Sequence, residues 1–151
     1  MPTLKELITR YSDRVRWVFR DFPIAGLHPE AQLVHEAARC AGEQGKFWLY
    51  HDLAFERAPA ASPANLREFA AEVGVNAAAF SQCLDSRKHR AAVATDIETG
   101  TKLGVTGTPT FFVNGALFVG NQPPAEFQRV VERELARVVV APPPPPPTSI
   151  R

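Results

Sequence analysis

The apolar positions along the chain change their spacing from one segment to the next, and each spacing predicts a different element. Near the N-terminus they fall at Leu4, Leu7, Ile8 and Tyr11, three or four residues apart, which predicts a short helix. Residues 15–22 are rich in β-branched and aromatic side chains that alternate with arginine, a pattern typical of a β-strand. The chain is therefore predicted to begin with a helix followed by a strand.

A long middle block, residues 30–103, has helical spacing throughout. Glycines and prolines divide it into several helices. Gly42 and Gly74 each follow a helical stretch, and Ser62-Pro63 has the residue types that begin one. A crossover between parallel strands usually carries a single helix, so a block of about 70 residues with several helices predicts a helical subdomain inserted into a small α/β sheet.

A hairpin and a final helix are predicted after this block. Residues 110–119 contain two short apolar runs separated by Asn114-Gly115, the strongest short hairpin signal, because both turn positions need positive φ. Helical spacing then returns over residues 124–138. Six prolines at 142–147 predict an extended tail that cannot join a core.

Composition and charge are those of an ordinary globular protein and exclude some partners. With 151 residues and a net charge of +1, the chain lacks the basic surface expected for binding nucleic acid or an anionic membrane. No apolar run approaches the ~18 residues needed to span a bilayer, and no targeting signal is recognisable at the N-terminus. We expect one domain over residues 1–140 and a disordered proline-rich tail over 141–151.

The chain has two cysteines, Cys40 and Cys83, and no Cys-x-x-Cys motif. Both lie on apolar helical stripes, where burial raises the pKa of a thiol and reduces its reactivity. His35 and His51 stand near Cys40 in the sequence, but no pair of residues has the spacing of metal ligands. We therefore predict no metal site and no cofactor.

Four stretches, occurring in the same order, resemble the DsbA-like thiol-disulfide oxidoreductase family of the thioredoxin superfamily. They are residues 2–7 with 15–23, residues 28–31 with 41–48 and 50–52, residues 83–86, and residues 104–115, which begin Gly-Val-Thr-Gly-Thr-Pro. The resemblance covers residues 2–135. It implies an α/β, thioredoxin-like fold with a helical subdomain inserted at about 30–103.

The resemblance implies a substrate-binding loop at Gly107, Thr108 and Pro109. In the family, the residue before a cis-proline presents backbone groups to a bound substrate strand, which implies a cis Thr108–Pro109 bond. A fold can select this isomer because an X-Pro bond prefers trans by only ~0.5–1 kcal/mol. The implied partners are cysteine-containing protein substrates or extended peptides.

The chain departs from the family at its start. In the family the redox-active Cys-x-x-Cys pair stands shortly before the position that Pro2 matches, and the central strand of the sheet precedes that pair. We therefore expect a copy truncated before the pair, with no catalytic residue and no dithiol chemistry in residues 1–151. The sheet would lack its first, central strand, and residues 15–22 and 110–113 would expose unpaired edges through which a homodimer could form.

The resemblance also implies a structural disulfide between Cys40 and Cys83, because family members carry cysteines at such positions of the insert. Two buried, inert thiols are the alternative, and the sequence leaves both open. The family further implies an oxidising, extracytoplasmic location, periplasmic or secreted.

Three functions follow from this resemblance. The first is a thiol-disulfide oxidoreductase in its complete form, redox-inactive as given. The second is a non-catalytic thioredoxin-fold module that binds a peptide or protein. The third is a glutathione-dependent isomerase of the same fold.

Overall fold

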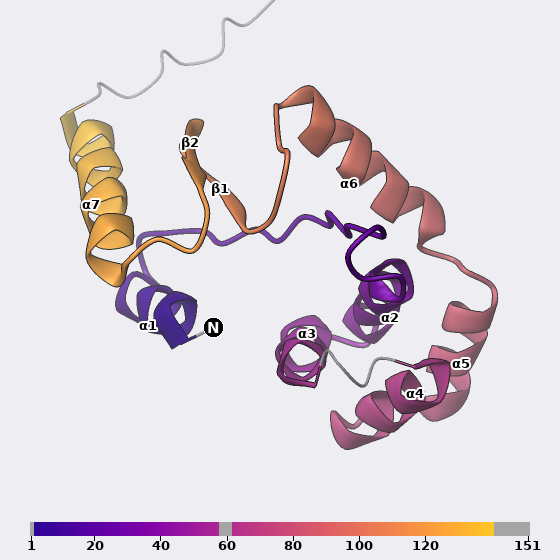
Figure 1. Ribbon diagram of the computed structural model, residues 1–151. Helices are drawn as coiled ribbons and strands as arrows, with labels where there is room; N and C mark the ends of the chain where they lie inside the picture. Colours follow the sequence, from indigo (N-terminus) through magenta and orange to yellow (C-terminus); the bar gives the residue numbers. More distant parts are fainter. Residues whose placement is uncertain (1, 58–61, 141–151) are drawn as a thin grey trace, which may run out of the picture. The chain divides into compact units, whose positions relative to one another are not determined.

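The structure is a computed structural model that describes residues 2–57 and 62–140 (Figure 1). The described residues form two compact units. The hairpin unit comprises the residues up to 19 and from 107 onward, and the helical unit comprises residues 20–106. The proline-rich tail predicted at 141–151 lies outside the described residues.

The hairpin unit contains two helices and a two-stranded antiparallel sheet. These are α1 (Pro2–Arg10), β1 (Thr110–Val113), β2 (Ala116–Val119) and α7 (Pro124–Val140). β1 and β2 pair in a register that sets Thr110 opposite Val119. The turn between them has positive φ at Asn114 (48°) and Gly115 (86°). The Asn-Gly hairpin predicted from the sequence is therefore confirmed.

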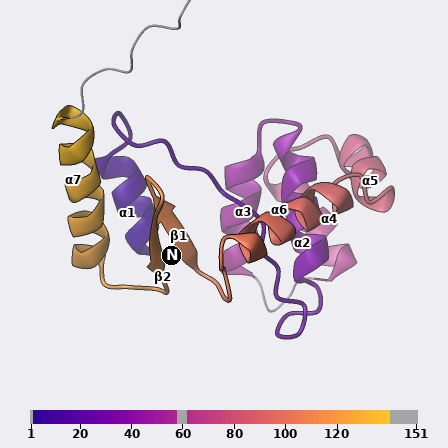
Figure 2. The same cartoon turned by 90° about the horizontal axis from the view of Figure 1, so that it is seen from above.

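One face of the hairpin packs against both helices of its unit. Phe111 and Phe118 lie on this face, and the ring of Phe127 from α7 stands edge-on to them, with ring centroids 4.8 and 4.5 Å away. Leu7 of α1, Tyr11 just after this helix and Val131 of α7 belong to the same cluster. Two views agree that α1 and α7 lie on the same side of the hairpin (Figure 1, Figure 2). This cluster is the core of the hairpin unit.

Residues 15–22 do not form a β-strand, so this part of the sequence prediction is wrong. Their side chains do alternate, since Val15, Trp17 and Phe19 are partly buried and the residues between them are exposed. A strand also needs a ladder of hydrogen bonds to a neighbour. In the described part of the chain the sheet has two strands, and β1 pairs with β2. Residues 15–22 therefore have the alternating exposure of a strand but lack backbone hydrogen bonds to a neighbouring strand.

The described residues of the helical unit form five helices: α2 (Ala31–Gly42), α3 (Phe47–Glu56), α4 (Pro63–Glu72), α5 (Ala77–Asp85) and α6 (Arg90–Lys102). Polar caps begin two of them. The Ser62 side chain accepts a hydrogen bond from the Asn65 amide at 3.3 Å, and Asn76 accepts one from the Ala79 amide at 2.9 Å. None of the helices within 2–57 and 62–140 is long and apolar enough to cross a bilayer.

Helix α2 is the centre of the helical unit, because it contacts α3, α4, α5 and α6. Small α2 side chains such as Ala37 and Ala41 pack against large rings, among them Tyr50 and Phe80. The Tyr50 side chain is fully buried, and its hydroxyl donates to the backbone oxygen of Leu66 at 3.0 Å. Burial raises the pKa of Tyr50. This core is separate from the one in the hairpin unit.

A glycine in α6 makes room for an aromatic ring. Gly100 lies inside the helix, where glycine is less favourable than alanine by ~1 kcal/mol. A Cβ at this position would stand 2.9 Å from the ring of Phe22, closer than carbon atoms pack. Glycine at position 100 therefore lowers the helix propensity of α6 but leaves space for the Phe22 ring to lie against the helix backbone.

Candidate functional site

The loop that leads into β1 holds the residues predicted to bind substrate. The Thr108–Pro109 peptide bond is cis, the isomer that the sequence predicts. Thr110 Oγ1 donates to the Gly107 oxygen at 2.6 Å, and the Gly120 amide donates to the Pro109 oxygen at 2.8 Å. Gly107 and Pro109 are partly buried, whereas Thr108 is exposed. The loop is thus fixed on both sides of one accessible residue.

The face of the hairpin turned away from its own helices is apolar and exposed. Phe112, Leu117 and Val119 are 42%, 52% and 53% exposed. Phe112 lies opposite Leu117 in the register, so the two side chains stand together on this face. Thr108, which is also exposed, lies two residues before β1 in the sequence.

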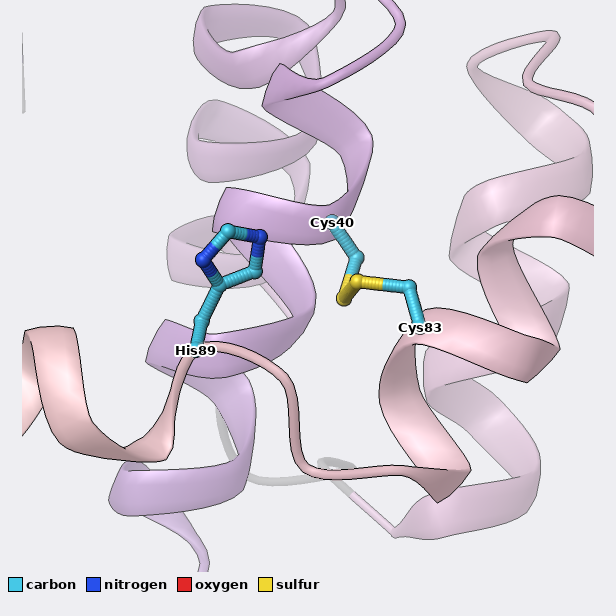
Figure 3. A group of neighbouring side chains, drawn as sticks. All are labelled: Cys40, Cys83 and His89. Carbon is cyan, nitrogen blue, oxygen red and sulfur yellow. A yellow bond between two sulfur atoms is a disulfide. The ribbon is translucent and has the colours of Figure 1, made fainter.

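The two cysteines form a disulfide inside the helical unit (Figure 3). Cys40 comes from α2 and Cys83 from α5, and their Cα atoms are 5.9 Å apart. They are 1% and 6% exposed. The bond therefore joins two helices of the core, and the alternative of two free thiols is excluded. Neither sulfur is placed as an exposed redox nucleophile.

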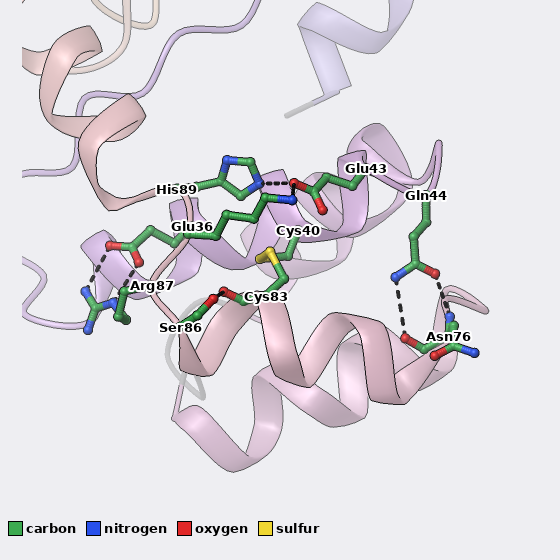
Figure 4. Close-up of a disulfide and its surroundings, with 10 residues drawn as sticks. Glu36, Cys40, Glu43, Gln44, Asn76, Cys83, Ser86, Arg87 and His89 are labelled. Carbon is green, nitrogen blue, oxygen red and sulfur yellow. Dashed lines mark hydrogen bonds and ion pairs between the residues drawn. A yellow bond between two sulfur atoms is a disulfide. The ribbon is translucent and has the colours of Figure 1, made fainter.

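Polar side chains surround the disulfide (Figure 4). Glu43, at the end of α2, accepts a hydrogen bond from Lys88 Nζ at 2.7 Å, and its Oε1 lies 2.9 Å from His89 Nε2. The hydrogen bond from Lys88 lowers the pKa of Glu43. Ser86 Oγ donates to the Cys83 oxygen at 3.0 Å. The solvent side of the disulfide is therefore lined with charge.

A second polar group is a buried cluster of ionic side chains in the helical unit. Arg39 of α2 donates from Nε to Asp21 and from Nη2 to Asp96 of α6, the latter at 2.6 Å. His35 Nδ1 lies 2.6 Å from Asp21, and Arg20 donates to Asp96 at 3.2 Å. Burial alone would raise the pKa of Asp21, but hydrogen bonds from His35 and Arg39 outweigh it and lower this pKa. The cluster ties residues 20–21 to α2 and α6.

The sequence analysis did not identify this cluster and gave residues 15–22, which include Arg20, as a β-strand. The alternation of residues 15–22 in the sequence already indicated that Asp21 would be buried. Odd-numbered positions such as Trp17 and Phe19 point inward, so Asp21 falls on an inward position as well. A buried carboxylate needs a cation or several donors. Arg39 is such a cation, one turn of α2 beyond His35.

The two histidines considered as metal ligands contact different residues in the structure. His35 contacts Asp21, as described above. His51 lies on α3, with Nδ1 3.1 Å from Asp52 and its ring 4.6 Å from that of Phe55. Burial lowers the pKa of His51. His89 is the histidine that lies beside the disulfide.

The cis bond before Pro109 is the feature that the resemblance to the thioredoxin superfamily implied. The model of the Thioredoxin family matches residues 1–133, so the chain belongs to this family. The chain is thus a mixed α/β, thioredoxin-like domain. No solved structure matches it.

The curated relatives are much longer proteins. The chain is 39% identical over 114 residues to "Na(+)/H(+) antiporter NhaA 3" of Salinispora tropica, a match that covers 76% of the chain and 17% of that protein. It is 38% identical to "Na(+)/H(+) antiporter NhaA 1" of Salinispora arenicola over the same shares. It is 32% identical to "Na(+)/H(+) antiporter NhaA" of Herminiimonas arsenicoxydans, over 84% of the chain and 20% of that protein. The chain therefore spans a fifth or less of the length of these relatives.

Proposed function

We propose that the chain is the substrate-binding part of a DsbA-like thiol-disulfide oxidoreductase that acts on cysteine-containing proteins outside the cytoplasm. This proposal rests mainly on the exposure of Thr108, which lies just before β1. Hydrogen bonds hold the residues on either side of it in place. Membership of the thioredoxin family supports this role. The oxidoreductase activity is proposed for a complete form with a Cys-x-x-Cys pair, a motif that residues 1–151 do not contain.

The substrate is proposed to bind in an extended conformation. β1 pairs with β2 along one edge, and in the described ranges no other strand adjoins it. Main-chain groups at a free edge can hydrogen-bond an added strand, while pockets for alternate side chains give specificity. The exposed Phe112 and Leu117 offer apolar contact on the same hairpin. This arrangement suits a peptide segment with apolar residues near its cysteine.

The test is peptide binding by the chain as given. A fluorescent, extended peptide with one alkylated cysteine and apolar neighbours is titrated, and anisotropy is measured. Thr108→Arg places a long charged side chain over the loop and is expected to weaken binding at least fivefold. Thr95→Arg, on the exposed side of α6, is the matched control and is expected to leave affinity unchanged. Equal affinity for both variants would overturn the proposed site.

A non-catalytic binding module is separated from a redox enzyme by a second assay. The buried Cys40–Cys83 bond is not placed to attack a substrate disulfide, so the chain alone is expected not to reduce insulin. Insulin reduction that disappears in Cys83→Ala would contradict this. Peptide binding without reduction fits the substrate-binding part of the enzyme and a binding module alike. If a form that carries Cys-x-x-Cys reduces insulin, the result supports the redox enzyme over the binding module.

The extracytoplasmic location is supported by the disulfide, because such bonds persist in oxidising compartments. Trapping cellular thiols with a maleimide before lysis tests it. Cys40 and Cys83 are expected to stay unlabelled. Full labelling of both would place the protein in a reducing compartment.

A second candidate role is that of a domain working with a Na⁺/H⁺ antiporter. It is favoured because the relatives described above carry that name and are matched over only 17–20% of their length. An antibody against the helical unit should then detect, in native membranes, either one long polypeptide or a complex with an antiporter. Detection of a free domain of about this mass, unassociated with membranes, would remove this candidate.

A further inference from the structure

The disulfide stands next to a histidine, and the three side chains form a compact group. Both sulfur atoms and one ring nitrogen of His89 lie within 4.8 Å of one another. Figure 3 shows the His89 ring facing the Cys40–Cys83 bond across a short gap. The three residues come from α2, from α5 and from the position just before α6. Three separate segments therefore converge on one point in the helical unit.

The ring nitrogen in this group is poorly satisfied by the protein. His89 Nε2 is buried and makes no directed hydrogen bond, and it lies 2.9 Å from Glu43 Oε1. The Glu43 carboxylate also pairs with Lys88, whose Nζ lies 2.7 Å from Oε1. A buried nitrogen and an anionic oxygen thus stand side by side next to two sulfurs (Figure 4).

We propose that reduction of the Cys40–Cys83 bond turns this group into a binding site for a thiophilic divalent cation, with Zn²⁺ as the favoured ion. The two thiolates and His89 are three ligands, and Glu43 is the fourth. Sulfur, imidazole and carboxylate are the ligand types that bind Zn²⁺ with tetrahedral geometry. The site belongs to the helical unit and does not depend on the substrate-binding role proposed for Thr108.

The chemistry is a two-electron exchange followed by metal binding. A dithiol reductant breaks the S–S bond, passes two electrons and two protons to the protein, and becomes a disulfide itself. The cation then displaces the two thiol protons, which go to solvent. Oxidation by a disulfide takes two electrons from the thiolates, re-forms the Cys40–Cys83 bond and releases the ion.

The backbone already has the spacing that such a site needs. Zn–S bonds are about 2.3 Å long, so two thiolates on one tetrahedral ion stand about 3.8 Å apart. With Cα atoms 5.9 Å apart, rotation of the two cysteine side chains can reach this separation while α2 and α5 stay in place. Lys88 has to release Glu43, which is a small change because its side chain is 57% exposed. The ion would enter from this side, where Glu43 is also accessible.

Cobalt titration of the whole chain tests the proposal. The protein is reduced with a phosphine, freed of reductant without oxygen, and titrated with Co²⁺, whose thiolate and tetrahedral absorption bands report the ligands. We expect one Co²⁺ per chain, release of about two protons, and displacement by Zn²⁺. The oxidised protein is the internal control and is expected to give no such bands.

Single variants identify the ligands. His89→Ala is expected to weaken Co²⁺ binding at least tenfold, and Glu43→Gln at least threefold. His28→Ala, at an exposed histidine outside the group, is the matched control and is expected to bind like the wild type. A His89→Ala protein that binds as tightly as the His28→Ala control would overturn the assignment.

Circular dichroism of the reduced protein covers the case in which loss of the disulfide unfolds the helices. If the reduced chain unfolds and Zn²⁺ restores its helical signal, the proposal is supported, because binding and folding are then coupled. A reduced chain that stays folded without binding metal would refute it. The same holds for a chain that unfolds and does not recover with Zn²⁺.

Discussion

Replacing Asp21 with asparagine tests whether the buried ionic cluster holds the helical unit together. Asp21 is 1% exposed and accepts hydrogen bonds from Arg39 and His35. Asparagine keeps the shape of the side chain, removes its negative charge, and turns an NH₂ group toward one of the two donors. We therefore expect Asp21→Asn to lower the free energy of unfolding.

The expected loss in the free energy of unfolding depends on which interactions the partners of Asp21 keep in the variant. A hydrogen bond to a charged group contributes ~1.5–3 kcal/mol, and removing one partner of a buried ion pair costs ~3–5 kcal/mol when the other is left alone. Arg39 is not left alone, because Asp96 remains 2.6 Å away and the Arg39 side chain is 26% exposed. We therefore expect a loss of about 2–3 kcal/mol, near the lower end of these ranges.

The pH dependence has a definite sign. The pKa of Asp21 is lower in the folded protein than its ordinary value. Its ionic contribution is therefore complete above the pKa of the unfolded chain, ~3.9, and is lost as the pH falls through the lower, folded-state pKa. The difference in stability between wild type and Asp21→Asn should be full near neutral pH and should shrink below about pH 4.

Urea denaturation followed by far-ultraviolet circular dichroism measures both effects, because the helical unit supplies most of the helical signal. The control is Asp85→Asn, whose exposed carboxylate pairs with an exposed Arg67, and which should change the free energy by ~0.5 kcal/mol or less. The reasoning fails if Asp21→Asn is no more destabilised than this control near neutral pH. It also fails if the gap to wild type stays constant down to about pH 3.

Three further replacements test the packing. Changing both Cys40 and Cys83 to alanine should lower the free energy of unfolding by ~4 kcal/mol in urea, because the disulfide closes a 43-residue loop; a loss below about 1 kcal/mol would contradict this model. Gly100→Ala should lower the melting temperature, since crowding of Phe22 at ~1–3 kcal/mol exceeds the ~1 kcal/mol gained in helix propensity; a rise would show that the ring has room. Phe127→Ala should cost ~3–5 kcal/mol and speed amide exchange in β1 and β2; unchanged exchange would refute its role.

Local signals in the sequence were enough for the elements that local chemistry determines. The hairpin at 110–119 follows from Asn114-Gly115, because few other dipeptides accept positive φ at both turn positions. Likewise, Ser62 and Asn76 begin helices because their side chains satisfy amides a few residues ahead. The resemblance to a known family supplied the cis bond before Pro109, which spacing alone does not determine.

Features that depend on distant partners were harder to predict. Residues 15–22 have the right alternation for a strand, yet a strand also requires a neighbour, and alternation says nothing about the neighbour. Asp21 and Arg39 meet only because the chain folds back, so their pairing has no local signature. His89 is beside the disulfide for the same reason, since the turn after α5 brings it there.

Helix α2 explains why the disulfide and the ionic cluster should be considered together. Within two turns of this helix, Glu36 receives hydrogen bonds of 2.7 and 2.9 Å from Arg87, Arg39 holds both buried aspartates, and Cys40 is bonded to Cys83. One short helix thus fixes α5, the turn that follows it, α6 and the segment at residue 21. Because these links share a rigid element, loosening any one should weaken the others, and their effects on stability should not be additive. A double-mutant cycle that combines Asp21→Asn with the two cysteine replacements should therefore show a coupling energy of ~0.5 kcal/mol or more, and strict additivity would mean that α2 does not connect them.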